Sequence, residues 1–150
     1  MVIFFIYIIL SSFLFCNENY VNVITTNDIH GFIDKQKANF INPQYPPTII
    51  GSSGLYEYVD RLKDDNNKLL LLDAGNFFQG HPLGISDSGK TIIKWMNKLG
   101  YHAFVPGNYD FLFGVENLIK LSEKANFDFL GANLFFKDSF TLSFETFSNV

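Results

Sequence analysis

Short apolar runs alternate with helical patterns from Tyr20 onward, and this alternation predicts β-α-β units around a mostly parallel sheet. The first expected strand covers about residues 20–26. Residues 69–73 (LLLLD) form a continuous apolar run that is typical of a strand buried on both faces. Two further strands are expected at 102–105 and 127–131. The pattern therefore predicts an α/β fold with four strands.

Helical periodicity fills most of the intervals between these strands. One apolar stripe at i, i+3, i+4 and i+7 predicts a helix that ends near the turn at 64–67, and it consists of Leu55, Tyr58, Val59 and Leu62. A second helix is expected at 89–99, with Gly100 as its stop signal, and a third at 115–124. Residues 35–50 contain three prolines and predict an irregular surface loop.

The first sixteen residues, MVIFFIYIILSSFLFC, carry no charged side chain. As a helix they would span about 24 Å, which is short of the ~30 Å hydrocarbon layer, so a signal peptide is favoured over a stable membrane span. An uncleaved anchor stays open, because no Lys or Arg precedes the run and Phe13, Leu14 and Phe15 are bulky for a cleavage site. We expect residues 1–19 to be a signal peptide or N-terminal anchor, and the protein to be exported to a periplasmic, cell-surface or secreted location.

Composition and charge narrow the class of protein. A chain of 150 residues with 47% apolar content can form one ordinary globular domain. The formal net charge of -4, with both signs interspersed, argues against a nucleic-acid partner, and membrane contact is expected only through the N-terminal segment. Cys16 is the single cysteine, so internal disulfides and zinc sites built on cysteine pairs are excluded. A lipid-modified Cys16 is an alternative to a filler role, although Phe15 is large for that processing.

Polar residues follow three successive expected strands. Asp28 and His30 (DIHG) come after the first, Asn76 (DAGNFFQG) after the second and Asn108 (PGNYDF) after the third. The carboxyl ends of parallel strands share one edge of the sheet, where ligands bind by default. An Asp-x-His pair suits zinc, manganese or iron. The alternatives are a turn cap for Asp28, a hydrogen-bonded loop histidine for His30, and turn residues with positive φ for both asparagines.

The order NDIHG, LLLDAGNFFQG, MNKLGYHAFVPGNYDF and GANL, over about residues 20–135, resembles the N-terminal half of the 5'-nucleotidase/UDP-sugar hydrolase branch of the calcineurin-like metallophosphoesterases. The resemblance implies the first part of a four-layer α/β/β/α sandwich, two divalent ions such as zinc or manganese, and a small phosphate ester or nucleotide as substrate. Residues 20–150 would then be an incomplete metallophosphoesterase domain.

Site roles carried over by the resemblance include two departures from the family pattern. Asp28 and His30 would bind the first metal and Asn108 the second, while Asn76 stands at the position of the aspartate that bridges both. Tyr109 stands where the family has its catalytic histidine, and Asp110 is the orienting acid. A neutral Asn76 should weaken a metal pair, and Tyr109, with a reference pKa of ~10, is a poor substitute for imidazole near neutral pH.

Further family histidines, including a Gly-His-x-His, have no counterpart, because only His81 and His102 follow His30. Alone, these 150 residues are expected to be inactive. The first functional hypothesis is therefore a nucleotide-hydrolysing enzyme completed by a missing part, and the second is a degenerate relative that binds a phosphate ligand or a partner.

A third hypothesis comes from GISDSGKT, residues 84–91, which fits the P-loop pattern of nucleotide binders. The preceding strand ends near Asp73, too early for a phosphate-binding loop, so Asp87 or Ser88 is expected to cap the next helix instead.

Overall fold

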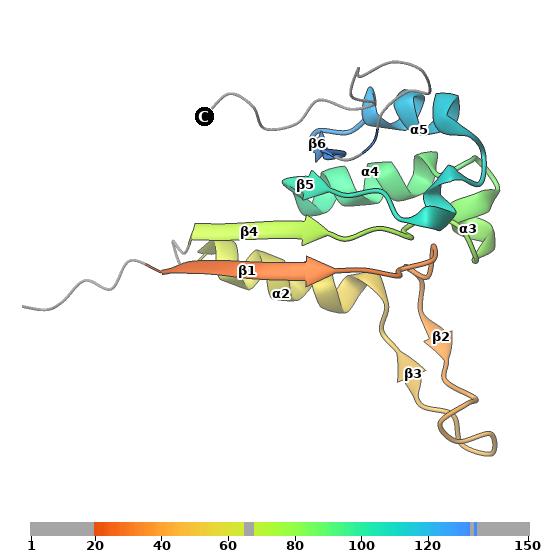
Figure 1. The fold of residues 1–150 in the computed structure, drawn as a ribbon. Coiled ribbons are helices and arrows are strands. Elements are labelled where there is room, and N and C mark those ends of the chain that lie inside the picture. Colours follow the sequence, from red (N-terminus) through yellow and green to blue (C-terminus); the bar gives the residue numbers. More distant parts are fainter. Residues whose placement is uncertain (1–19, 65–67, 133, 135–150) are drawn as a thin grey trace, which may run out of the picture.

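The computed structural model of this protein describes residues 20–64, 68–132 and 134. Four parallel strands form its main sheet in the order β1-β4-β5-β6 (Figure 1). These strands are β1 (Val21–Thr26), β4 (Lys68–Asp73), β5 (Ala103–Phe104) and β6 (Asp128–Phe129). The predicted α/β class with a parallel sheet is confirmed.

Helices connect each strand to the next one along the sheet. They are α2 (Ser52–Asp64), α3 (Pro82–Ile85), α4 (Lys90–Leu99), the 3-10 helix η1 (Asn108–Phe111) and α5 (Val115–Ser122). Every crossover steps in the same direction, and right-handed crossovers of that kind place their helices on one face of the sheet. The core is accordingly one-sided.

The hydrophobic core lies between the sheet and these helices. Leu71, Phe104, Ile92, Met96 and Leu118 are each fully buried. Apolar residues of α4 recur at helical spacing, and Gly100 ends that helix with φ 81°, where it donates its N–H to the last carbonyls. The predicted helix at 89–99 thus matches α4 within one residue at its start.

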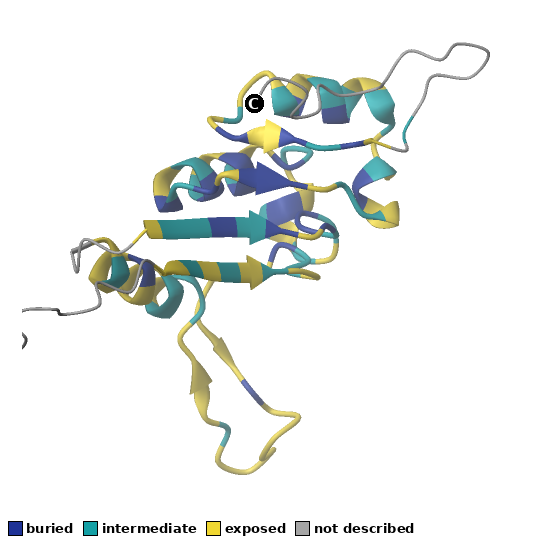
Figure 2. Ribbon diagram, turned by 60° about the vertical axis from the view of Figure 1, so that its left-hand side comes forward, coloured by how far each residue is buried: buried dark blue, intermediate teal, exposed yellow. Residues whose placement is uncertain are grey.

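The opposite face of the sheet is largely uncovered. Val21 and Val23 on β1 are 53% and 56% exposed, and Leu70 and Leu72 of β4 are only half-buried (Figure 2). The expectation that residues 69–73 are buried on both faces was therefore wrong, because no layer among the described residues packs on this second face.

The predicted irregular loop at 35–50 is also corrected. It contains the antiparallel pair β2 (Gln36–Lys37) and β3 (Thr48–Ile49), which forms an arm that projects away from the main sheet (Figure 1). The arm is held together beyond the strands, because Ala38 donates its N–H to the Pro47 carbonyl at 2.8 Å. Pro47 contributes only an acceptor there, so a proline is compatible with the pairing.

No helix among the described residues is long and apolar enough to cross a membrane. The predicted N-terminal signal or anchor, with Cys16, lies outside the described residues.

Candidate functional site at the carboxyl ends of β1, β4 and β5

The loops after β1 and β4 remain paired beyond the ends of the strands. Asp28 donates its N–H to the Gly75 carbonyl and His30 donates to the Asn76 carbonyl, both at 2.9 Å. These bonds continue the contact between the two segments past their last registered pair, Thr26 and Asp73, so residues 28 and 76 stand next to each other although 48 positions separate them in sequence. The sheet therefore brings two of the three polar clusters together.

Side chains of these two loops are in direct contact. The Asn76 amide Nδ2 donates to Asp28 Oδ1 at 2.8 Å, and His30 Nε2 lies 3.6 Å from the same oxygen. Two hydrogen bonds, from Asn76 first and from Asn27 second, lower the pKa of the exposed Asp28 carboxyl below its usual value. Asp28 is thus an ionised acceptor near neutral pH.

Backbone conformation marks the same residues. Asp28, His30 and Asn76 have φ values of 52°, 50° and 56°, in the left-handed region that side chains other than glycine seldom adopt. Such residues cost roughly 1–3 kcal/mol each and cluster at functional sites. The prediction that Asn76 has positive φ as a turn residue therefore describes its backbone correctly, while its side chain also faces the site.

Gln79 holds the far side of the His30 ring. His30 Nδ1 lies 3.1 Å from the Gln79 carbonyl oxygen, and the Gln79 side-chain amide contacts the same nitrogen at 2.5 Å. Both contacts are to the same ring nitrogen, so they hold the ring with Nε2 toward Asp28. Metal-binding histidines are commonly oriented through a hydrogen bond to their other ring nitrogen.

The third loop, after β5, reaches the site through its backbone. Tyr109 donates its N–H to Asn76 Oδ1 at 3.0 Å, and its ring, 51% exposed, lies edge-on to the His30 ring with 6.0 Å between centroids. Asn108 begins η1 next to Tyr109 and is exposed. Among the residues that the structure describes, the Asn108 side chain is not hydrogen-bonded to Asp28, His30 or Asn76. Only the backbone of this loop is therefore placed beside them.

Asp110 is fully buried, and its carboxylate is hydrogen-bonded to backbone N–H groups. Its carboxylate accepts N–H groups from Asn76 at 2.7 Å, Phe77 at 2.9 Å and Gly107 at 2.8 Å. Burial raises the pKa of Asp110, and these backbone donors oppose that effect. Asp110 therefore joins the loops after β4 and β5 through the main chain, whereas the resemblance implied an acid that orients residue 109.

A second buried carboxyl lies behind the site, and the sequence analysis missed it. Asp73, 2% exposed, accepts a hydrogen bond from Thr26 Oγ1 at 2.6 Å and from the Gly75 N–H at 2.8 Å. Thr26 Oγ1 also lies 2.8 Å from the Tyr101 hydroxyl. Burial raises the pKa of Asp73 to about 6. The only signal in the sequence was the acidic residue that ends the apolar run LLLLD.

The donor set fits one cation better than two. Asp28 and His30 present an oxygen and a nitrogen 3.6 Å apart, a separation that two ligands of one ion can have. Across the part of the chain that the structure describes, however, no three His, Cys, Asp or Glu side chains come together. Asn76 adds an amide, not a charge, to this pair.

The P-loop hypothesis is not supported by the geometry. Gly84, its first glycine, lies inside α3 and is buried, so it does not form a loop directly after a strand. The N-cap of α4 is Gly89, without a side-chain cap hydrogen bond, so the predicted cap at Asp87 or Ser88 was wrong in position. Asp87 Oδ2 nevertheless accepts from the Thr91 N–H at 3.0 Å and from its hydroxyl at 2.8 Å, and so bonds the first turn of α4 from outside the helix.

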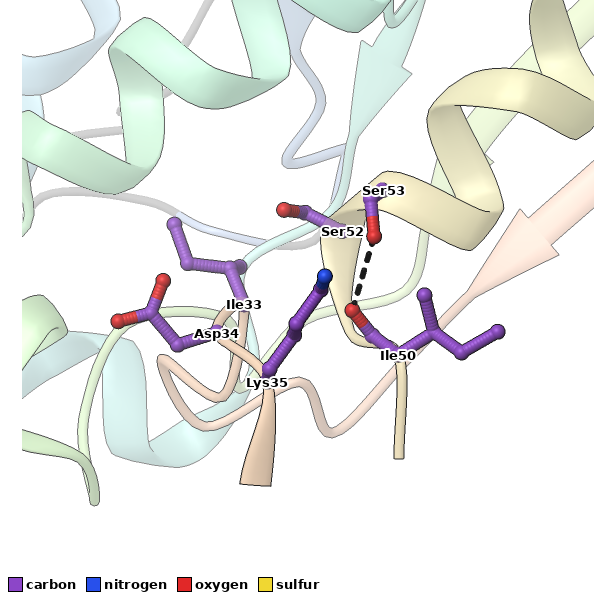
Figure 3. Close-up of a pocket in the computed structure, with 6 residues that line it drawn as sticks. All are labelled: Ile33, Asp34, Lys35, Ile50, Ser52 and Ser53. Carbon is purple, nitrogen blue, oxygen red and sulfur yellow. Dashed lines mark hydrogen bonds between the residues drawn. The ribbon is translucent and has the colours of Figure 1, made fainter. Parts of the chain in front are cut away.

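A shallow pocket of about 400 Å³ lies at the base of the arm, beside the start of α2 (Figure 3). It is lined by Ile33, Asp34, Lys35, Ile50, Ser52 and Ser53. None of the predicted site residues lines this pocket, and Ser53 donates to the Ile50 carbonyl at 3.0 Å within its wall. The polar cluster at the strand ends is therefore separate from it.

A parallel α/β sheet with polar loops gathered at its carboxyl edge defines the class of this chain, and comparison with known proteins defines its family. The family model described as "Calcineurin-like phosphoesterase" matches residues 21–147. The chain belongs to this family.

Similar sequences are 5'-nucleotidases. The protein from Bos taurus is 31% identical over 116 residues, which cover 76% of this chain and 20% of that protein. The protein from Vibrio cholerae is 30% identical over 131 residues, which cover 85% of this chain and 22% of that protein. The chain thus spans about a fifth of the length of these relatives.

Solved structures share the fold. NAD nucleotidase from Haemophilus influenzae aligns with a TM-score of 0.65 at 24% identity, covering 81% of this chain and 22% of that chain. A 5'-nucleotidase precursor from Thermus thermophilus aligns with a TM-score of 0.61 at 25% identity, covering 75% and 22%. The predicted metallophosphoesterase fold, in its N-terminal part, is confirmed.

Proposed function

We propose that residues 20–150 supply the first part of a metal-dependent phosphoesterase domain that hydrolyses small phosphate esters, in particular nucleotides. The observation that carries this proposal is the contact of Asp28 with both His30 and Asn76 at the carboxyl edge of the sheet. Membership of the family and the similarity to 5'-nucleotidases support the reaction and the substrate class.

Asp28 and His30 would hold the divalent ion, and a bound ion of this kind supplies Lewis-acid activation of water and of the phosphoryl group. The chain's own residues contribute position and hydrogen bonds. Tyr109, half-exposed beside His30, can donate its hydroxyl to a phosphate oxygen. Asp110 acts as a positioning residue, since it fixes the backbone of Asn76 and Gly107 without contacting solvent.

Export is part of the proposal. It rests on the charge-free first sixteen residues, which the sequence analysis interprets as a signal peptide or anchor. A small-molecule substrate outside the cytoplasm fits a hydrolase of this type.

The test uses the longest natural form of the protein that contains this chain. AMP hydrolysis with added Mn²⁺ is measured for the wild type, for Asp28→Asn and for Asp34→Asn, which changes an exposed carboxylate outside the site. We expect metal-dependent phosphate release that falls at least a hundredfold in Asp28→Asn and stays unchanged in Asp34→Asn. Equal activity in all three would remove Asp28 from the site.

A degenerate, non-catalytic relative is the second candidate, and Asn76 and Tyr109 favour it. The double variant Asn76→Asp, Tyr109→His separates the two functions in the same assay. If hydrolysis is absent in the wild type and appears in the double variant, the natural protein is a binding relative and not an enzyme.

A further inference from the structure

The orientation of the Asn76 amide is fixed at both ends. Its Nδ2 donates to Asp28 Oδ1 at 2.8 Å, and its Oδ1 accepts the Tyr109 N–H at 3.0 Å. A carboxylate near neutral pH can only accept, and a backbone N–H can only donate. The amide therefore cannot be turned around without loss of both hydrogen bonds.

This orientation determines where a cation can bind. An amide NH2 group carries partial positive charge and has no lone pair for a metal ion, so the space between Asp28 and Asn76 is closed to a cation. Each Asp28 oxygen accepts one hydrogen bond, Oδ1 from Asn76 and Oδ2 from Asn27 Nδ2, both at 2.8 Å, and keeps one further acceptor site. Of the two oxygens, Oδ1 is the one that faces another metal-binding atom, His30 Nε2, at 3.6 Å.

Charge leads to the same conclusion. Two divalent ions close together need negative charge between them, and a neutral asparagine at position 76 provides none. Asn108 is neutral as well and is exposed. Asp73 and Asp110 are both buried, and their oxygens accept hydrogen bonds from Thr26 and from backbone N–H groups.

We propose that Asn76 is an internal tie that replaces a bridging ligand, so that this site binds a single divalent ion between Asp28 and His30. The tie links the three loops of the site without metal, since Asn76 bonds one side chain from the β1 loop and one backbone group from the β5 loop. The inference rests on the proposed function only for the location of the site, and it concerns metal content, not substrate.

The experiment is a Mn²⁺ titration of the longest natural form of the protein that contains this chain, with bound metal counted by equilibrium dialysis and electron paramagnetic resonance, and with the melting temperature recorded with and without Mn²⁺. The variants are Asn76→Asp, Asn76→Ala and Asn42→Asp. The last is a matched control in the arm, where Oδ1 of Asn42 accepts backbone N–H groups that an aspartate can also bind.

We expect one Mn²⁺ per wild-type chain, with the signal of an isolated ion. Asn76→Asp places two carboxylates in contact, so its metal-free melting temperature should fall, while its Mn²⁺ affinity should rise about tenfold. Asn76→Ala should lower the metal-free melting temperature without any gain in affinity. Asn42→Asp should match the wild type in both measurements.

Two spin-coupled Mn²⁺ ions per wild-type chain would overturn the inference, as would no bound Mn²⁺ at all. An Asn76→Asp variant with unchanged melting temperature and unchanged affinity would contradict the tie. Failure of the proposed function is separate, because a protein that binds one ion but releases no phosphate from AMP would keep this inference and refute the enzyme.

Discussion

Asp110 accepts the backbone N–H of Asn76 at 2.7 Å across 34 positions of sequence, and it thereby joins the loop after β4 to the loop after β5. The same carboxylate binds the N–H groups of Phe77 and Gly107, so one buried side chain holds the two loops on either side of the candidate site. The geometry of the site therefore depends on a residue that does not itself face solvent.

Asp110→Asn tests this anchoring role. An asparagine keeps the shape but turns an NH2 group toward backbone N–H donors, which leaves buried donors unpaired. We expect the free energy of unfolding, measured by urea denaturation, to fall by about 2–3 kcal/mol. Glu57→Gln, which removes only the exposed Arg61 ion pair of α2, should change it by less than about 0.5 kcal/mol. Equal losses in both variants would contradict the role of Asp110.

The raised pKa of Asp73 predicts that the free energy of unfolding depends on pH. Its pKa in the folded protein is raised by burial from 3.8 to about 6, so the folded state binds this proton more tightly than the unfolded state does. The stabilisation that the protonated Asp73 carboxyl provides is complete below its unfolded pKa of 3.8 and is lost as pH rises through its folded pKa of about 6. Relative to Asp73→Asn, the wild type should lose about 2–3 kcal/mol of unfolding free energy between pH 4 and 7.5, by urea denaturation at several pH values.

A second variant sharpens the pH experiment. Thr26→Val removes a hydrogen bond that lowers the pKa of Asp73, so the decline in stability should extend to higher pH. A wild type that runs parallel to Asp73→Asn at every pH would show that the Asp73 carboxyl keeps an ordinary pKa in the folded state.

Two Gly→Ala substitutions should have opposite effects on the free energy of unfolding. A Cβ on Gly84 would overlap the carbonyl group of Phe78, with the carbonyl carbon only 2.6 Å away. The clash is with backbone, which cannot rotate away as a flexible side chain can. A Cβ on Gly54 of α2 would have only the Ile50 side chain nearby, at 3.7 Å. In thermal or urea unfolding, Gly84→Ala should cost about 1–3 kcal/mol, and Gly54→Ala should gain about 0.5 kcal/mol. A tolerated Gly84→Ala would refute the close packing of α3 on this loop.

Local sequence patterns predicted the strands of the main sheet and the helices α2, α4 and α5, because apolar spacing reports directly which face of an element is buried. The arm was missed, since Gln36 and Ile49 pair across thirteen positions and the intervening prolines indicated a loop. The burial of Asp73 could not be predicted either, because it depends on Thr26 and Tyr101 from other parts of the chain.

The candidate site, too, was predictable from the sequence only in part. The positions of Asp28, His30 and Asn76 followed from one rule about the carboxyl ends of parallel strands. The direction of the Asn76 amide did not, since it is decided by two partners that only the folded chain brings near.

The main chain at position 109 is held by Asn76 and by the Asp110 anchor, while the side chain points its half-exposed ring outward. The scaffold thus specifies where residue 109 stands but not which reactive group it carries. A single codon change could exchange phenol for imidazole here, so the functional group at this position can change without any rebuilding of the fold.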